Sequence, residues 1–152
     1  MRLRTTCTIL ALLMGVAAPS VAYTSDEKAP DQQSIGLLEA RIRQAPPREQ
    51  CFLYAQLIHQ MAELSLQQYA AGNAAKATAM LKKIQQLANQ LHLSLADDNK
   101  RLKNAEILLR HAAFRLREMS RSSSYEDRPL VEETLAQVDQ ADNDAMMQVF
   151  KK

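Results

Sequence analysis

The stretch AAKATAMLKKIQQLANQLHLSLADDNKRLKNAEILLRHAAFRLREMSR, residues 74–121, decides the fold class. It contains no glycine and no proline, and two series of mostly apolar residues recur in it at every seventh position. The first series is Leu81, Ala88, Leu95, Leu102, Leu109 and Leu116, and the second is Ile84, Leu91, Asp98, Ala105, Ala112 and Met119. Coiled coils and helical bundles bury a seam of this kind. We therefore expect an all-α protein, an antiparallel helical bundle built on this stretch.

Residues 96–99, Ala-Asp-Asp-Asn, are the only helix-poor part of the stretch, and they leave two alternatives. Ser94 followed by Asp97 is typical of a new helix start, which would break the stretch near 97–99 and produce a compact four-helix bundle. Against a break, the heptad register continues without a slip. The basic residues at 100, 101 and 103 would also be unfavourable at the positive N-terminus of a helix. We favour one continuous helix.

The residues before the stretch predict two shorter helices. Ser34 can cap a helix over 35–44, which the Pro46-Pro47 pair would end. Pro47 suits the first turn of a second helix over 47–71. Gly72 and Asn73 are typical of a left-handed helix end, so a turn should precede the long stretch.

Charge predicts which segment lies beside the second half of the long stretch. Residues 100–121 contain seven basic and two acidic side chains, whereas residues 122–152 contain seven acidic and three basic ones. Opposite net charges favour side-by-side packing of the two segments. Residues 122–124 would form the loop between them, and Pro129 suits the first turn of the final helix. Residues 34–152 are thus expected to form a single helical domain.

The N-terminal residues are typical of a secretory signal peptide. Arg2 and Arg4 precede an apolar run over residues 9–18, and Ser20-Val21-Ala22 supplies small residues for cleavage before Tyr23. The run is shorter than the ~20 residues that span a bilayer, so no stable membrane anchor is expected after cleavage. Residues 1–22 would be removed, residues 23–33 would form a flexible leader, and the protein would be periplasmic or extracellular.

Removal of residues 1–22 also removes the excess of basic charge. The full chain has 19 Lys and Arg against 17 Asp and Glu, and residues 1–22 contain two arginines and no acid. The remaining 19 − 2 = 17 basic residues equal the 17 acidic ones. The sequence therefore does not predict nucleic-acid binding, because the precursor's basic balance belongs to the targeting segment.

No pattern of catalytic, cofactor-binding or metal-binding residues emerges. Cys51 is the only cysteine after cleavage, and its apolar neighbours predict burial on a helix face rather than a catalytic thiol. His59 and Glu63 are four residues apart and could face one metal ion, but a metal site needs three or four ligands. His92 and His111 have no comparable partner in the sequence. We expect no enzyme activity, no cofactor and no metal.

Two resemblances accompany this interpretation. Gly72-Asn73-Ala74-Ala75-Lys76-Ala77, followed by Leu81 and Ile84, resembles the turn and second helix of one tetratricopeptide-type hairpin; two antiparallel helices joined by a Gly-Asn turn explain the same residues. Residues 95–109, with Cys51-Phe52-Leu53-Tyr54 and Gln148-Val149-Phe150, resemble small exported all-helical bacterial proteins of unknown function. This second resemblance implies export and an all-helical fold, and no activity.

The sequence thus predicts an exported, non-enzymatic helical protein that acts by binding another protein or a second copy of itself. A homodimer is expected together with a continuous long helix, whose seam one chain could not cover. The alternative is a periplasmic chaperone-like or stress-binding protein, suggested by five methionines that could adapt to varied apolar partners: Met61, Met80, Met119, Met146 and Met147.

Overall fold

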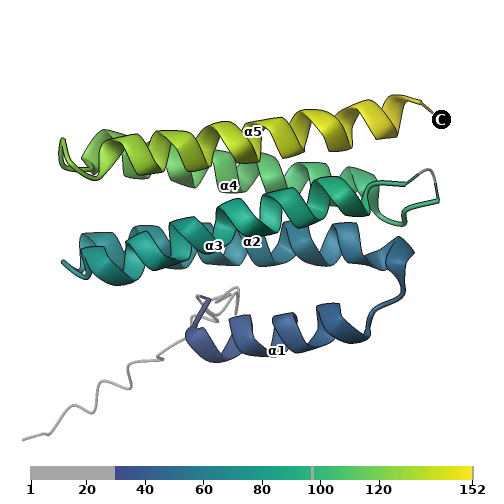
Figure 1. The fold of residues 1–152 in the computed structure, drawn as a ribbon, viewed down its shortest axis with the longest axis horizontal. Helices are drawn as coiled ribbons and strands as arrows, with labels where there is room; N and C mark the ends of the chain where they lie inside the picture. Colours follow the sequence, from purple (N-terminus) through teal and green to yellow (C-terminus); the bar gives the residue numbers. More distant parts are fainter. Residues whose placement is uncertain (1–29, 97, 152) are drawn as a thin grey trace, which may run out of the picture.

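The computed structural model describes residues 30–96 and 98–151, which form five α-helices and no strand. The helices are α1 (Gln32–Gln44), α2 (Pro47–Ala70), α3 (Ala74–Ser94), α4 (Leu102–Ser122) and α5 (Arg128–Phe150). Consecutive helices run antiparallel (Figure 1). The expected all-α helical bundle is confirmed. The expected signal peptide, residues 1–22, lies outside the described residues, as does most of the expected leader.

The long stretch is two helices, so the continuous helix that we favoured is wrong and the alternative break near 97–99 is correct. α3 ends at Ser94, whose carbonyl accepts a hydrogen bond from the Asn99 side-chain amide at 2.9 Å. The backbone N–H of Lys100 donates to the carbonyl of Arg48 in α2, also at 2.9 Å. These bonds satisfy backbone groups that a continuous helix would have paired internally, and a heptad pattern carries no trace of them.

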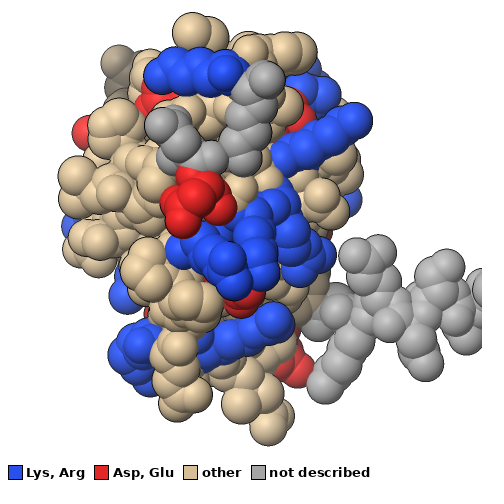
Figure 2. Space-filling model, turned by 90° about the vertical axis from the view of Figure 1, so that its right-hand side faces the viewer, with Lys and Arg blue, Asp and Glu red and all other residues tan. Residues whose placement is uncertain are grey.

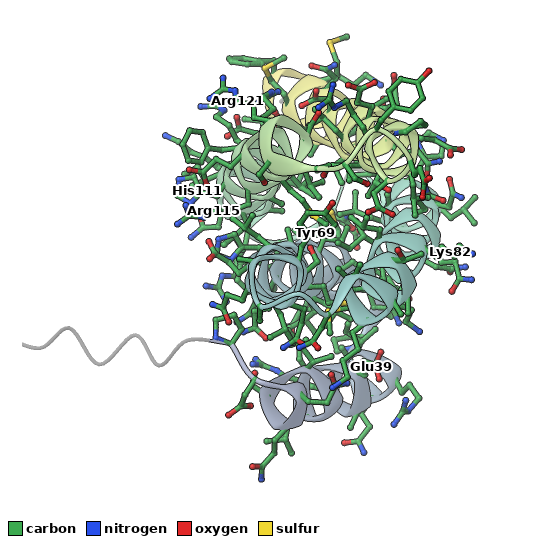
Figure 3. The ribbon with its side chains drawn as sticks, turned by 90° about the vertical axis from the view of Figure 1, so that its left-hand side faces the viewer. Glu39, Tyr69, Lys82, His111, Arg115 and Arg121 are labelled. Carbon is green, nitrogen blue, oxygen red and sulfur yellow. The ribbon has the colours of Figure 1, made fainter. Side chains whose placement is uncertain are left out.

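The helices pack as two stacked hairpins, α2 with α3 and α4 with α5. α2 contacts α4 and α3 contacts α5, and each of these pairs runs in the same direction (Figures 1 and 3). Among the described residues α3 and α4 do not pack on each other. The chain must therefore cross the end of the bundle diagonally between α3 and α4. We call the connection, residues 95–101, the crossover; its described residues are 95–96 and 98–101, and Lys100 is bonded to the start of α2. α1 packs on the outer side of α2.

The core is closed within one chain. The seam residues are buried, apart from Leu95, which is half-buried, and Asp98, which is exposed in the crossover. Cys51 is fully buried, as expected. Ile107 and Phe114, two apolar residues of α4 outside the seam, are 40% and 53% exposed. The reason is that α4 has two neighbours in the bundle, and its third side faces solvent.

Charge complementarity between α4 and α5 is confirmed by their packing and by an ion pair between Arg117 Nη2 and Asp139 Oδ1 at 2.7 Å. Tyr69 of α2 lies between the two hairpins and holds the connection from α4 to α5 (Figure 3). Its hydroxyl donates to Asp127 Oδ2 at 3.0 Å and accepts from the backbone N–H of Ser124 at 2.8 Å. This connection lies at the opposite end of the bundle from the crossover (Figure 1).

The outer helix begins earlier than the sequence predicted. Asp31, not Ser34, is the N-cap of α1: its carboxylate accepts from the Ser34 N–H at 2.7 Å, and the Ser34 hydroxyl accepts from the Asp31 N–H at 3.1 Å. This reciprocal capping box places two residues of the expected leader in the first turn. Within the described residues, no helix combines the length and apolar composition that crossing a membrane requires.

Candidate functional site

One side of α2 carries a row of polar side chains instead of apolar ones. The row lies between α1 and α4, both of which pack on α2. Its members lie three or four residues apart, apart from the adjacent pair His59 and Gln60, so they share one broad helix face: Gln56, His59, Gln60, Glu63 and Gln67. Such a row on a long, otherwise buried helix forms the floor of a groove.

Two other helices supply the walls of this groove. α4 presents Leu108, His111, Phe114 and Arg115, again at helical spacing, and the start of α1 contributes Pro30, Asp31 and Ser34. Figure 3 shows His111 and Arg115 projecting together from the edge of α4 nearest α2, on the opposite side of the bundle from Lys82. The enclosed space is about 750 Å³. We call it the side groove; its volume is within the range of ligand sites, ~300–1,000 Å³.

Glu63 is the electrostatic centre of the side groove. Its Oε1 atom lies 2.6 Å from Arg115 Nε and 3.8 Å from His59 Nε2. Arg115 also donates through Nη1 to Glu118 Oε2 at 2.8 Å. Hydrogen bonds to Glu118 and Glu63 raise the pKa of the Arg115 guanidinium, so its positive charge is fixed. The groove therefore offers both signs of charge within a few ångströms.

Two amide groups in the floor have acceptors without partners. The Oε1 atoms of Gln56 and Gln60 are buried, and no hydrogen bond reaches either one within the described part of the chain. A buried polar atom without a partner costs about 1–3 kcal/mol, so both amides would gain a hydrogen bond if their side chains turned to present these acceptors to a molecule in the groove. The exposed ring of Phe114 in the adjoining wall supplies an apolar surface.

The histidines do not assemble into a metal site. The rings of His59 and His111 lie 5.9 Å apart, and His59 is the member close to Glu63. Among the described residues no group of three or more His, Cys, Asp and Glu side chains could hold a metal ion. His92 lies elsewhere, with its Nδ1 atom 2.8 Å from Asp144 Oδ2.

Cys51 is not placed for catalysis. It lies beneath the crossover, fully buried, and burial raises the pKa of its thiol from 9.0 to about 11, although hydrogen bonds with Asn99 and Ser94 act in the opposite direction. The thiol is therefore neutral at physiological pH, whereas a nucleophilic cysteine needs a lowered pKa.

The sequence indicated only the α2 half of the groove, through the pair His59 and Glu63. It missed the α4 wall, although His111 and Arg115 have the same four-residue spacing. The four-residue spacing of His59 and Glu63 recurs in His111 and Arg115, and this repeat on two helices was the sequence signal for a shared groove. No protein-family model, curated protein or solved structure matches the chain. The side groove must therefore be interpreted from its own chemistry.

Proposed function

We propose that this chain is an exported, non-enzymatic binding protein that holds an extended segment of another protein in the side groove. The observation that carries the proposal is the pair of buried, unpartnered acceptors of Gln56 and Gln60. An amide side chain presents an acceptor and a donor next to each other, which matches the alternating N–H and C=O groups of an extended backbone. Phe114 would contact an apolar side chain of the same segment.

The dimensions of the floor suit a short segment. From Gln56 to Gln67 the floor covers eleven helical steps, about 17 Å at ~1.5 Å per residue. An extended chain advances ~3.3 Å per residue, so about five residues would fit along the floor. The mixed charges of Glu63 and Arg115 would fix the direction of the segment, because a basic side chain fits one position and an acidic side chain the other.

Two expectations from the sequence lose their support. A homodimer was expected because a continuous helix would have left part of the seam exposed, and the broken stretch buries this seam within the chain. The chaperone-like alternative was suggested by the export signal and by five methionines, which could contact varied partners only from the surface. Met61 and Met119 are buried and Met80 and Met146 are half-buried, which leaves Met147 as the exposed one of the five.

The proposal can be tested by panning a random heptapeptide phage library on immobilised protein that begins at Tyr23. Peptides enriched on this protein should bind a Gln56→Leu/Gln60→Leu variant roughly tenfold more weakly, because two hydrogen bonds of about 0.5–1.5 kcal/mol each are lost. The matched control is Gln86→Leu/Gln90→Leu, the same exchange at the same spacing on the exposed side of α3.

The control should retain full affinity for the selected peptides. Both variants should remain folded, because leucine in place of Gln56 and Gln60 removes two unpartnered acceptors from the floor. Failure to enrich any peptide, or equal losses in the two variants, would contradict peptide binding in the side groove. Full affinity in both variants would show that the selected peptides bind elsewhere on the protein.

A further inference from the structure

Five helix ends meet at one end of the bundle. They are the C-terminal ends of α1, α3 and α5 and the N-terminal ends of α2 and α4, and the crossover lies among them (Figure 1). The side groove is bounded by the opposite end of α1, so this end of the bundle is separate from it. What gathers here is basic charge, and Lys and Arg side chains cover much of this face (Figure 2).

The basic residues come from two segments distant in the sequence, residues 41–48 and 100–103. Arg41, Lys100 and Arg101 line one shallow pocket together, and Lys100 is hydrogen-bonded to the backbone of Arg48. We call the full set the basic end surface: Arg41, Arg43, Arg48, Lys100, Arg101 and Lys103. All six are exposed.

Acidic side chains do not neutralise this surface. Residues 41–49 and 95–103 contain three acids, Glu49, Asp97 and Asp98, against the six basic residues, which leaves 6 − 3 = +3. Glu49 lies 3.7 Å from Lys100, the single ion pair that the described residues make within the set. In the C-terminal half of α4, by contrast, Arg115 and Arg117 each pair with an acid of a neighbouring helix.

The position of these charges is locally unfavourable. Lys100, Arg101 and Lys103 stand at the N-terminal end of α4, where the helix dipole is positive, and Arg48 stands at that of α2. Arg101 also adopts a left-handed backbone, with φ 59°. The contact of the Arg101 guanidinium with the Phe52 ring offsets part of this cost, and a binding role is one reason for a sequence to retain the rest. Two helix N-termini and six cations together create a field that attracts anions.

Exposed apolar side chains lie at the same end. Leu93, in the last turn of α3, is 76% exposed, and Phe150, the last residue of α5, is 80% exposed. Basic side chains combined with bulky apolar ones suit the surface of an anionic bilayer, because the charges attract the headgroups while the apolar groups enter the boundary with the acyl chains. A nucleic-acid duplex, whose outer surface is phosphate, would engage the charges and leave these apolar side chains exposed.

We infer that the basic end surface docks reversibly on an anionic phospholipid bilayer, with Leu93 and Phe150 entering the headgroup region. Export, which the N-terminal residues predict, would bring the protein next to a membrane. The contact is peripheral, since among the described residues no helix is long and apolar enough to span the bilayer. Docking through this end leaves the side groove open to solution, so a protein segment and the membrane can be bound together.

The experiment is sedimentation with vesicles, using protein that begins at Tyr23 and therefore keeps every described residue. The protein should bind vesicles of phosphatidylglycerol and phosphatidylcholine at low salt, and neither vesicles of phosphatidylcholine alone nor the mixed vesicles at high salt. The variant Arg43→Glu/Arg48→Glu/Lys103→Glu should lower the partition coefficient roughly a hundredfold, because each basic side chain near such a surface contributes about fivefold. These three side chains are exposed and take part in no ion pair of the described structure.

The matched control is Lys76→Glu/Lys82→Glu/Arg121→Glu, which changes the net charge equally on exposed residues in the first half of α3 and the last turn of α4, away from the basic end surface. Arg121 is separated from that surface by nearly the whole of α4, about 30 Å. Because salt screens charges beyond ~10 Å, the control should lower the partition coefficient by less than about threefold. Thermal melts followed by circular dichroism confirm that the variants fold. Equal losses in the two triple variants, or no binding of the unmodified protein to anionic vesicles, would overturn the proposal.

A further variant separates a lipid surface from a general polyanion. Leu93→Ser/Phe150→Ser should weaken vesicle binding about fivefold or more, because two exposed apolar groups no longer enter the bilayer. Unchanged vesicle binding by this variant would overturn the assignment to lipid. So would tighter binding of the unmodified protein to a single-stranded DNA oligonucleotide than to the anionic vesicles.

Discussion

The turn between α2 and α3 and the crossover between α3 and α4 both connect antiparallel helices, but different interactions stabilise them. The turn needs only Gly72 at φ +83° and a few backbone hydrogen bonds to its own helix ends, and it makes α2 and α3 neighbours. The crossover carries the chain to the diagonal position of the bundle. It is held by contacts with a distant segment: Lys100 to the Arg48 carbonyl, and the Arg101 guanidinium 3.6 Å from the centroid of the Phe52 ring.

The difference teaches which connections a sequence can reveal. A turn made by a left-handed glycine is recognisable from its own residues, because few other residues adopt that conformation at low cost. A crossover fixed by tertiary contacts has no such local mark. The crossover should therefore be the connection whose stability depends on residues of another helix, and the following substitutions test that dependence.

The largest effect is expected for Phe52→Ala. Phe52 is buried against the crossover, and its loss removes core contacts and the ring beneath Arg101. The free energy of unfolding should fall by about 3–5 kcal/mol, measured by urea denaturation. The control is Phe114→Ala, an aromatic of the same size that is 53% exposed and should cost far less. Similar losses for the two variants would show that Phe52 does not support the crossover.

A smaller effect, and one that depends on pH, is expected at Cys51. The folded thiol keeps its proton up to a pKa of about 11, whereas the unfolded thiol loses it near 9.0. Stability from this group is thus complete below pH 9 and is lost as the pH rises towards 11. The loss should be about 2–3 kcal/mol.

The measurement for Cys51 compares urea unfolding at about pH 8 and about pH 11 in the unmodified protein and in Cys51→Ala, which lacks the group. Lysines and tyrosines titrate equally in both proteins, so the difference in pH dependence isolates the thiol. An identical pH dependence in the two proteins would mean that the thiol under the crossover is open to water.

The parts of the fold that were predictable are those set by local chemistry. The heptad seam identified the buried faces of α3 and α4, Pro47 marked the start of α2, and Gly72 marked the first turn. We favoured a continuous helix over a break near 97–99, in part because the basic residues after Asp98 are unfavourable at a helix start. They are tolerated because contacts made by Asn99, Lys100 and Arg101 hold the crossover in place.

The side groove was only half predictable for a related reason. His59 and Glu63 were visible as a pair on one helix. Their neighbours His111 and Arg115 face them only because α4 lies parallel to α2, and that arrangement is a consequence of the crossover. A site formed by two helices cannot be read from either sequence pattern until their packing is known.

The smallest changes in stability are expected at the left-handed residues of the two connections, where one variant removes a glycine and the other introduces one. Gly72→Ala should lower the free energy of unfolding by about 1 kcal/mol, since alanine is strained at positive φ. Apart from the residues next to it in the chain, nothing lies within 4 Å of the added methyl group, so this cost is conformational and not a clash with another part of the fold.

Arg101→Gly makes the reverse exchange at the left-handed residue of the crossover. It relieves a similar strain but forfeits the contact with the Phe52 ring and makes the unfolded chain more flexible, so the net change should be within about 0.5 kcal/mol. Urea denaturation measures the free energy of unfolding of Gly72→Ala and of Arg101→Gly. If Arg101→Gly destabilises the protein more than Gly72→Ala does, the Arg101 side chain contributes more to the crossover than its backbone strain costs. If it clearly stabilises the protein, the contact with Phe52 contributes little, and the left-handed arginine is retained at a cost in stability, which would strengthen the case that the basic end surface serves binding.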